Sequence, residues 1–161
     1  MLEDFAAVEP ENAEFYAAAK VDFAAYVQSL LDEEHGLNLR EGWVPCSHRW
    51  LVNESGAVVG ATRLRHNINT PFLAENGGHI GYDIAPSYRR LGYGHCALAA
   101  ALSLARQHGL PQVLLFAAED NAASRAVIQG QGGILESTSF SAFWGEQLCR
   151  YWINVPSEPE P

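Results

Sequence analysis

The feature that most constrains the fold is the stretch from Tyr82 to Ala105, YDIAPSYRRLGYGHCALAAALSLA. Its apolar, strand-like beginning stops at Ala85-Pro86, because proline cannot donate a hydrogen bond to a sheet. An alanine-rich helix follows near Gly92, after two arginines. Backbone N–H groups at a helix start have no partner within the helix, and the helix dipole favours an anion there. The stretch therefore predicts a turn that binds a phosphate.

The rest of the chain predicts one mixed α/β domain over residues 1–155, with a disordered tail at residues 156–161. A helix is expected from about Glu11 to Glu34, ended by His35-Gly36. A hairpin (residues 49–66), a strand (79–84), a helix (92–108) and a second strand (112–118) are expected to follow. A helix (121–129) and two strands (134–140 and 149–155) complete the domain. The run QVLLFAA lacks alternation, which is typical of a strand covered on both faces. We expect a mostly antiparallel sheet with flanking helices.

Composition excludes several classes of protein. The net charge of −9 disfavours binding to nucleic acid or to an anionic membrane. No apolar run approaches the roughly 20 residues of a membrane helix, and the acidic first residues do not resemble a secretory signal. The cysteines Cys46, Cys96 and Cys149 are scattered without a C-x-x-C, so neither a disulfide framework nor a metal site is expected. We expect a cytoplasmic protein.

Three interpretations of the glycine turn compete. In the simplest, the glycines only permit a tight turn, and Arg89 and Arg90 are solvated. In the second, GYGHCA matches the dinucleotide fingerprint G-x-G-x-x-A of an NAD-binding oxidoreductase, with Glu119 or Asp120 near the ribose. A loop separates the strand from the glycines, however, and little sequence remains for a second nucleotide-binding half. In the third, R-x-x-G-x-G binds a pyrophosphate, because glycines without Cβ atoms let the backbone approach the phosphate oxygens.

The third interpretation gains support from a resemblance to a known family. IAPSYRRLGYG resembles motif A of the GNAT N-acetyltransferase superfamily, and EDNAAS resembles that family's second signature, an asparagine near the end of a strand. The order of elements from about Arg49 to Val155 is similar as well. GGHIGYDIAPSYRRLGYG and NAASRAVIQGQGG are similar, more narrowly, to a bacterial branch of predicted acetyltransferases. The resemblance implies a splayed pair of strands and acetyl-CoA as co-substrate, without a metal.

The resemblance also implies where the co-substrate binds. The strand from His79 to Ile84 would pair through its backbone with the pantetheine arm, and Asn121 would hold that arm by its amide. Ser124 would contact the phosphate end. The implied cofactor-binding residues are Asp83, Ile84, Arg89, Arg90, Leu91, Gly92, Tyr93, Gly94, His95, Asn121 and Ser124. Asparagine is also a good helix N-cap, and Asn121 can fill both roles.

The implied reaction is direct transfer of an acetyl group from acetyl-CoA to a primary amine of a small molecule or a peptide. The amine must lose a proton, and a backbone N–H can stabilise the oxyanion. Ile128 occupies the family's usual tyrosine position, and Gly78 occupies a usual carboxylate position, so both side chains are missing. The candidate catalytic residues are His79, Tyr82 and Glu119, with Glu75, Asp83 and ordered water as further possibilities.

Several alternatives stay open. The missing catalytic side chains also fit an acyl-CoA-binding or sensing domain with little turnover. Arg63 and Arg65 share one strand face, where they either line a substrate cleft or are solvated. A histidine at a strand start, such as His79, is more often structural than catalytic. Homodimers are common in the family, and the acceptor amine is expected to depend on the first helix and on residues 67–78.

Overall fold

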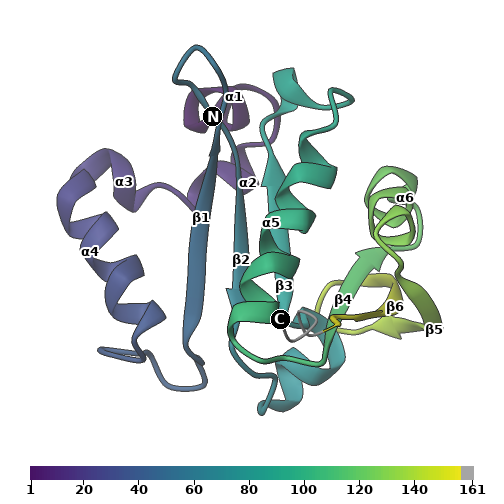
Figure 1. Ribbon diagram of the computed structural model, residues 1–161. Coiled ribbons are helices and arrows are strands. Elements are labelled where there is room, and N and C mark those ends of the chain that lie inside the picture. Colours follow the sequence, from purple (N-terminus) through teal and green to yellow (C-terminus); the bar gives the residue numbers. More distant parts are fainter. Residues whose placement is uncertain (157–161) are drawn as a thin grey trace, which may run out of the picture.

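The structure is a computed structural model that describes residues 1–156, so the predicted tail lies outside the described residues except for Pro156. Two three-stranded antiparallel sheets form the core of the fold, in the orders β1-β2-β3 and β4-β6-β5 (Figure 1). The strands are β1 (Cys46–Val52), β2 (Val58–Arg65), β3 (Ile80–Ile84), β4 (Gln112–Ala118), β5 (Ile134–Ser141) and β6 (Glu146–Asn154). The predicted mixed architecture with antiparallel pairing is confirmed.

The N-terminal region differs from the prediction. In place of one helix from Glu11 to Glu34, the chain forms α1 (Leu2–Val8), α2 (Pro10–Glu14), α3 (Ala18–Val21) and α4 (Phe23–Glu34). Asp22 interrupts the helical path with an extended backbone, at φ −149° and ψ 102°. Its side chain accepts a hydrogen bond of 2.9 Å from the Ala25 N–H and thereby caps α4. The prediction of a continuous helix was wrong because this N-cap aspartate lies inside an apolar helical pattern.

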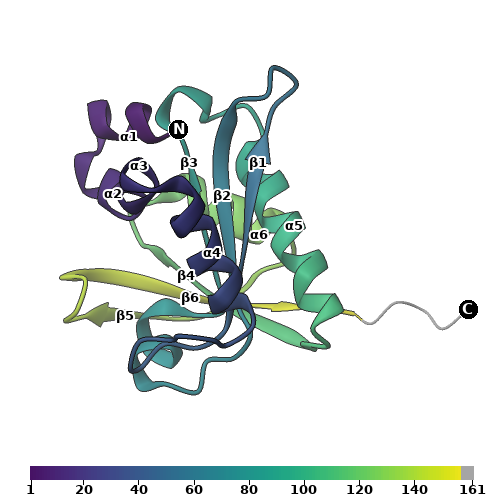
Figure 2. The same cartoon turned by 90° about the vertical axis from the view of Figure 1, so that its left-hand side faces the viewer.

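The first sheet has helices on two sides. The predicted hairpin is confirmed, although β1 begins at Cys46, before the predicted start. Figure 2 shows α4 on one side of this sheet and α5 (Tyr93–Gln107) on the other. Leu64 of β2 is buried in the core with Leu98 of α5, so its neighbours Arg63 and Arg65 lie on the opposite face.

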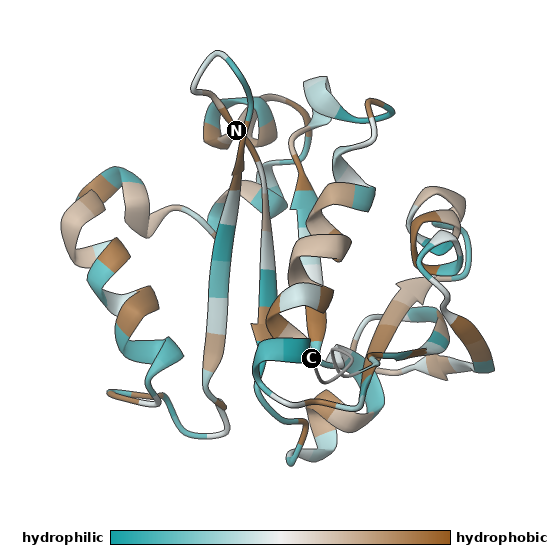
Figure 3. Ribbon diagram, viewed as in Figure 1, coloured by the Kyte–Doolittle hydropathy of each residue, from teal (hydrophilic) through white to brown (hydrophobic). Residues whose placement is uncertain are grey.

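Helix α4 is attached only loosely by apolar packing. No residue of α4 is buried, and hydrophobic and hydrophilic residues alternate along it (Figure 3). Its aromatic contacts are with Trp50 of β1, whose ring centroid lies 5.6 Å from that of Phe23 and 6.5 Å from that of Tyr26. The docking of α4 on β1 therefore depends also on polar contacts near the C-terminus of the helix.

The main core is formed by α5 and α6 (Ala122–Gly130) together with residues of both sheets, including Leu64 and Ile80 of the first sheet. The predicted helix near residues 121–129 is present as α6, and its Ile128 is fully buried together with Leu98 and Tyr151. Val113, Leu114 and Leu115 are buried in succession. This pattern confirms that β4 is covered on both faces, as its continuous apolar run predicted.

The two sheets meet where β3 begins. The backbone N–H of His79 donates to the carbonyl oxygen of Leu114 at 2.7 Å, yet β3 and β4 are not paired in either sheet. This is the splayed strand pair that the family resemblance implied. A π-helical turn, η1 (Leu73–Gly77), precedes β3, and a 3₁₀ turn, η2 (Pro86–Tyr88), follows it. Within residues 1–156, no helix is long and apolar enough to cross a membrane.

Candidate functional site

The turn before α5 has an open outer side. Arg90 and Gly92 both have positive φ angles, 61° and 86°, so the chain curls sharply into the helix. A Cβ atom placed on Gly92 would have no neighbour within 4 Å in the part of the chain that the structure describes. The N–H groups of Gly92, Tyr93 and Gly94 have no acceptor among the described residues, whereas those of His95 and Cys96 donate to the Gly92 carbonyl. The turn has the space, donors and dipole that an anion requires.

The two arginines of the turn have different environments. Arg89 donates to the Glu9 carboxylate, with an Nη2–Oε2 distance of 2.7 Å, and to the Ile84 carbonyl at 3.0 Å. The hydrogen-bonded Glu9 carboxylate raises the pKa of Arg89. This ion pair connects the turn to the N-terminal helices. Within the described residues, Arg90 has no hydrogen-bonding or ionic partner. Arg90 is thus the cation that is available to a bound anion.

The second glycine of the motif has a packing role. A Cβ atom on Gly94 would lie 3.2 Å from Cγ2 of Val127 and 3.9 Å from the ring of Tyr82. Gly94 therefore lets α5 approach α6 and β3 closely, while its backbone N–H stays at the helix start. Gly92 leaves the turn open, whereas Gly94 brings the surrounding elements together.

The start of α6 lies next to β3. Oδ1 of Asn121 accepts the Ser124 N–H at 3.0 Å, which confirms the predicted N-cap, and its Nδ2 has no partner in the described part of the chain. The Ser124 hydroxyl lies 2.9 Å from the Tyr82 hydroxyl. Burial raises the pKa of Tyr82, so its phenol remains protonated. Tyr82 thereby links the first sheet to the helix that follows β4.

His79 connects the two sheets through both its backbone and its side chain. Its Nδ1 accepts the Leu114 N–H at 2.9 Å, and the residue is 6% exposed. Burial, together with the nearby charge of Arg65, lowers the pKa of His79 to about 4. The ring is therefore neutral at neutral pH and carries its proton on Nε2, because the Nδ1 lone pair is already engaged. This environment suits a structural role better than that of a proton acceptor.

Gly78 and Glu119 complete the set of residues that the sequence singled out. A Cβ atom on Gly78, whose φ is 64°, would lie 2.5 Å from the Leu114 carbonyl oxygen, so the backbone leaves no room for a carboxylate. Glu119 is exposed just beyond β4, and its backbone carbonyl accepts a hydrogen bond from Arg125. Glu119 lies five residues of extended chain, about 16 Å, beyond Leu114. Leu114 is the residue of β4 that contacts His79. The structure does not bring His79 and Glu119 together.

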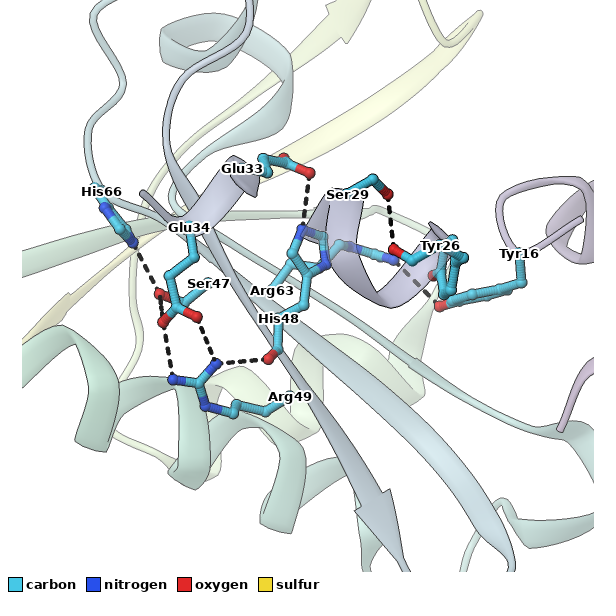
Figure 4. Close-up of polar contacts among 10 residues, drawn as sticks. All are labelled: Tyr16, Tyr26, Ser29, Glu33, Glu34, Ser47, His48, Arg49, Arg63 and His66. Carbon is cyan, nitrogen blue, oxygen red and sulfur yellow. Dashed lines mark hydrogen bonds and ion pairs between the residues drawn. The ribbon is translucent and has the colours of Figure 1, made fainter. Parts of the chain in front are cut away.

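A polar network that the sequence did not reveal lies on the other face of β3. Oδ2 of Asp83 accepts hydrogen bonds from the Tyr16 hydroxyl at 2.6 Å and from Nη2 of Arg63 at 2.7 Å. Arg63 also donates to the Tyr16 hydroxyl, a contact visible in Figure 4. Asp83 and Tyr82 therefore point to opposite faces, as strand periodicity predicted, and Arg63 is partly buried in an ion pair. Tyr16 was missed because it lies 67 residues away in the sequence.

A cavity of about 710 Å³ lies between η1 and the second sheet. Its lining residues are Glu75, Asn76, Phe116, Glu136, Ser137, Ser139, Phe140, Ser141, Ala142, Phe143 and Arg150. Glu136 forms an ion pair with Arg150, whereas Glu75 has no ionic partner among the described residues. Arg150 already lies over the Phe116 ring, 5.5 Å from its centroid, so the Glu75 carboxylate is the lining group that would attract a further cation.

Comparison with known proteins places this arrangement in a family. The sequence profile of the acetyltransferase (GNAT) family matches residues 10–132. The chain belongs to the GNAT acetyltransferase family. The dinucleotide interpretation of GYGHCA is therefore wrong, in agreement with antiparallel sheets that differ from the parallel sheet of a dinucleotide fold. A search of curated protein sequences found no match.

Solved structures of several acetyltransferases share the fold. Ribosomal-protein-S5-alanine acetyltransferase from Vibrio fischeri superposes with a TM-score of 0.62 at 16% identity, over 84% of this chain and 70% of that one. The yncA protein from Salmonella typhimurium, with its cofactor acetyl-CoA, gives a TM-score of 0.52 at 18% identity, over 68% and 65% of the two chains. A chimera of spermidine N-acetyltransferase from Vibrio cholerae and hSSAT gives a TM-score of 0.57 at 15% identity, over 81% of this chain and 79% of that one.

Proposed function

We propose that this GNAT protein transfers the acetyl group of acetyl-CoA to a primary amine of a small molecule or a peptide. The main support is the open turn at the start of α5, where Gly92 leaves space and Arg90 has no ionic partner among residues 1–156. Family membership and the acetyl-CoA in one structural neighbour support the same co-substrate. Cytoplasmic location and homodimer formation remain predictions.

The proposed co-substrate site follows the splayed strands. The diphosphate is proposed to lie on the backbone N–H groups of residues 90–94, because those of Arg89 and His95 donate to the Pro86 and Gly92 carbonyls. Arg90 would add a charge-assisted hydrogen bond. The pantetheine arm runs along the backbone of β3 near Ile84 and is held by Nδ2 of Asn121, because Oδ1 of that residue already caps α6. Ser124 lies at the same helix start and connects this site to Tyr82.

The proposed reaction is a direct transfer. The neutral amine attacks the thioester carbonyl carbon, a C–N bond forms, and the oxyanion collapses as the C–S bond breaks. The CoA thiolate then takes a proton, for which the protonated phenol of Tyr82 is our candidate donor. The proton from the attacking nitrogen leaves through water, since His79 uses its Nδ1 to accept the Leu114 N–H. Glu119 remains a candidate base on the exposed turn after β4.

The acceptor amine is proposed to bind in the cavity beside β4. Phe116 belongs to β4, which is one strand of the splayed pair, and it also lines this cavity. Glu75, which has no ionic partner among the described residues, would attract an ammonium group. The exposed rings of Phe140 and Phe143 would contact the carbon chain that bears it. An amine with an apolar or aliphatic body fits this lining.

A second candidate function is acyl-CoA binding with little turnover. The observations that favour it are the buried Ile128 at the usual tyrosine position and the steric block at Gly78. Such a domain would bind acetyl-CoA and leave its thioester intact.

Release of free CoA thiol distinguishes the two functions. The purified chain is incubated with acetyl-CoA and a panel of polyamines, amino-acid amides and peptides with free N-termini, and the acetylated product is confirmed by mass. The proposal predicts amine-dependent thiol release that saturates with at least one amine. Thermal stabilisation by acetyl-CoA without thiol release would favour the second candidate, and stabilisation by NAD alone would contradict both.

A further inference from the structure

A cluster of metal-ligating side chains lies between α4 and β1, apart from the proposed acetyl-CoA turn. Glu33 is near the C-terminus of α4, and Cys46 and His48 are two residues apart on β1, so their side chains share one face. One carboxylate oxygen, the thiol sulfur and one imidazole nitrogen all lie within 4.8 Å of one another. Oε2 of Glu33 is 3.1 Å from Nε2 of His48. Figure 4 draws this contact as a dashed line.

We propose that Glu33, Cys46 and His48 bind a divalent transition metal ion, with zinc as the expected ion. A thiolate, an imidazole and a carboxylate are the donors that zinc prefers, and ligands of one tetrahedral zinc lie roughly 3.3–3.7 Å apart. Because no separation exceeds 4.8 Å, no pair needs to contract by more than about 1.5 Å, and the Glu33–His48 pair at 3.1 Å needs no contraction. Three protein ligands leave the fourth position for water.

Burial suits these residues to a built site. Cys46 is 3% exposed, and the side chains of His48 and Glu33 are 17% and 15% exposed. Burial raises the pKa of the Cys46 thiol to about 12, so without an ion this sulfur is a neutral group. A bound metal deprotonates a coordinating thiol, and two negative ligands then balance a divalent cation.

Neighbouring charges are compatible with this assignment. Arg65 and Arg63 lie opposite Cys46 and His48 in the β1–β2 pairing, and both would repel a cation. Arg63 is neutralised by its ion pair with Asp83, and Nη1 of Arg65 donates to the carbonyl oxygens of residues 77 and 78. Glu34 is not included among the ligands because its carboxylate is bound by Arg49 and Ser47.

The ion would connect α4 to the first sheet. No residue of α4 is buried, so its docking depends on contacts such as the one between Glu33 and His48. A metal bound to one residue of α4 and two residues of β1 replaces that single hydrogen bond by three coordinate bonds. We therefore expect zinc to raise the Tm and to slow amide hydrogen exchange in α4.

Cobalt(II) is the probe that tests the site. The full chain is freed of metal with a chelator and titrated with cobalt(II), whose absorption reports sulfur ligation and tetrahedral geometry. We expect a one-to-one titration with a thiolate-to-cobalt charge-transfer band that zinc abolishes by displacement. Cys46→Ser should remove this band, and His48→Gln should weaken cobalt binding by about tenfold or more.

Matched variants make the test decisive. Cys96 is exposed and follows His95, so it is the obvious site for adventitious cobalt binding, and Cys96→Ser should keep the band. Glu33→Gln should weaken binding, whereas the neighbouring Glu34→Gln should not. Circular dichroism of each metal-free variant checks that it is folded. Absence of a thiolate band in the folded wild type, or a band that survives Cys46→Ser, would overturn the proposal.

Discussion

Nδ1 of His79 accepts the backbone N–H of Leu114 at 2.9 Å, while the His79 N–H donates to the Leu114 carbonyl at 2.7 Å. These two hydrogen bonds join the first sheet to the second at the point where β3 and β4 begin to separate. The imidazole must be neutral to accept the Leu114 N–H, which makes the junction dependent on pH.

The first prediction concerns this pH dependence. Burial lowers the pKa of His79 to about 4 in the folded state, from about 6.5 when unfolded, so the unfolded chain binds more protons between these values. The stabilising contribution of neutral His79 is therefore complete above pH 6.5 and is lost as the pH falls toward 4. This loss lowers the free energy of unfolding by about 3 kcal/mol. His79→Asn keeps an acceptor for the Leu114 N–H and does not titrate in this range.

Urea denaturation of both proteins between pH 4 and pH 7 measures the effect. The free energy of unfolding should fall more steeply for the wild type than for His79→Asn. Parallel curves would show that His79 does not cause the loss of stability in acid.

The second prediction concerns the close approach at Gly78. Alanine at this position would combine a positive φ with a Cβ placed 2.5 Å from the Leu114 carbonyl oxygen. We expect Gly78→Ala to lower the free energy of unfolding by about 2–4 kcal/mol. Gly132→Ala is the matched control, because Gly132 has a φ of 85° but no atom of the described residues lies within 4 Å of its Cβ position. Equal losses for the two variants in denaturant titrations would argue against steric contact with β4.

The third prediction separates the two arginines of the turn. Arg90→Ala should weaken acetyl-CoA binding by about tenfold, because it removes a charge-assisted hydrogen bond to the diphosphate. Arg89→Ala should weaken binding less, since Arg89 is paired with Glu9. Arg106→Ala removes the same charge at the far end of α5 and should leave the affinity unchanged. The dissociation constants can be obtained from ligand-dependent thermal shifts. The assignment fails if Arg106→Ala weakens binding as much as Arg90→Ala does.

The fourth prediction tests Tyr82 as the proton donor. Tyr82→Phe should lower kcat by about a hundredfold, because the departing thiolate loses its proton source. The deficit should shrink with acetyl thioesters whose thiol is more acidic, since such leaving groups need less help. Ser124→Ala, which removes the hydrogen-bonding partner of the phenol but keeps the phenol, should have a smaller effect. A deficit that is the same for all leaving groups would indicate that Tyr82 only positions neighbouring residues.

Local signals predicted the turn and the helices around it. The glycines and arginines of residues 89–94, the N-cap asparagine of α6 and the uninterrupted apolar run of β4 each determine structure within a few residues. The break at Asp22 was also local, but the apolar pattern around it obscured the cap. By contrast, the hydrogen bond of Tyr16 to Asp83 depends on tertiary packing.

The cluster of Glu33, Cys46 and His48 also depends on tertiary packing and could not be predicted from local sequence. The spacing of the cysteines predicted no metal site, because a spacing rule recognises ligands that are close in sequence. The ligands here come from a helix and a strand that are joined by a loop, and only the docking of α4 beside β1 brings them together. Likewise, the block at Gly78 arises from the backbone of β4, which lies far along the chain.

Isothermal titration of the chain with acetyl-CoA tests the central claim most directly. The proposal predicts saturable one-to-one binding by the wild type, and a loss of about tenfold or more in affinity for Gly92→Val, whose side chain would fill the open side of the turn. Absence of binding by the folded wild type, or equal affinity in the folded Gly92→Val variant, would contradict it.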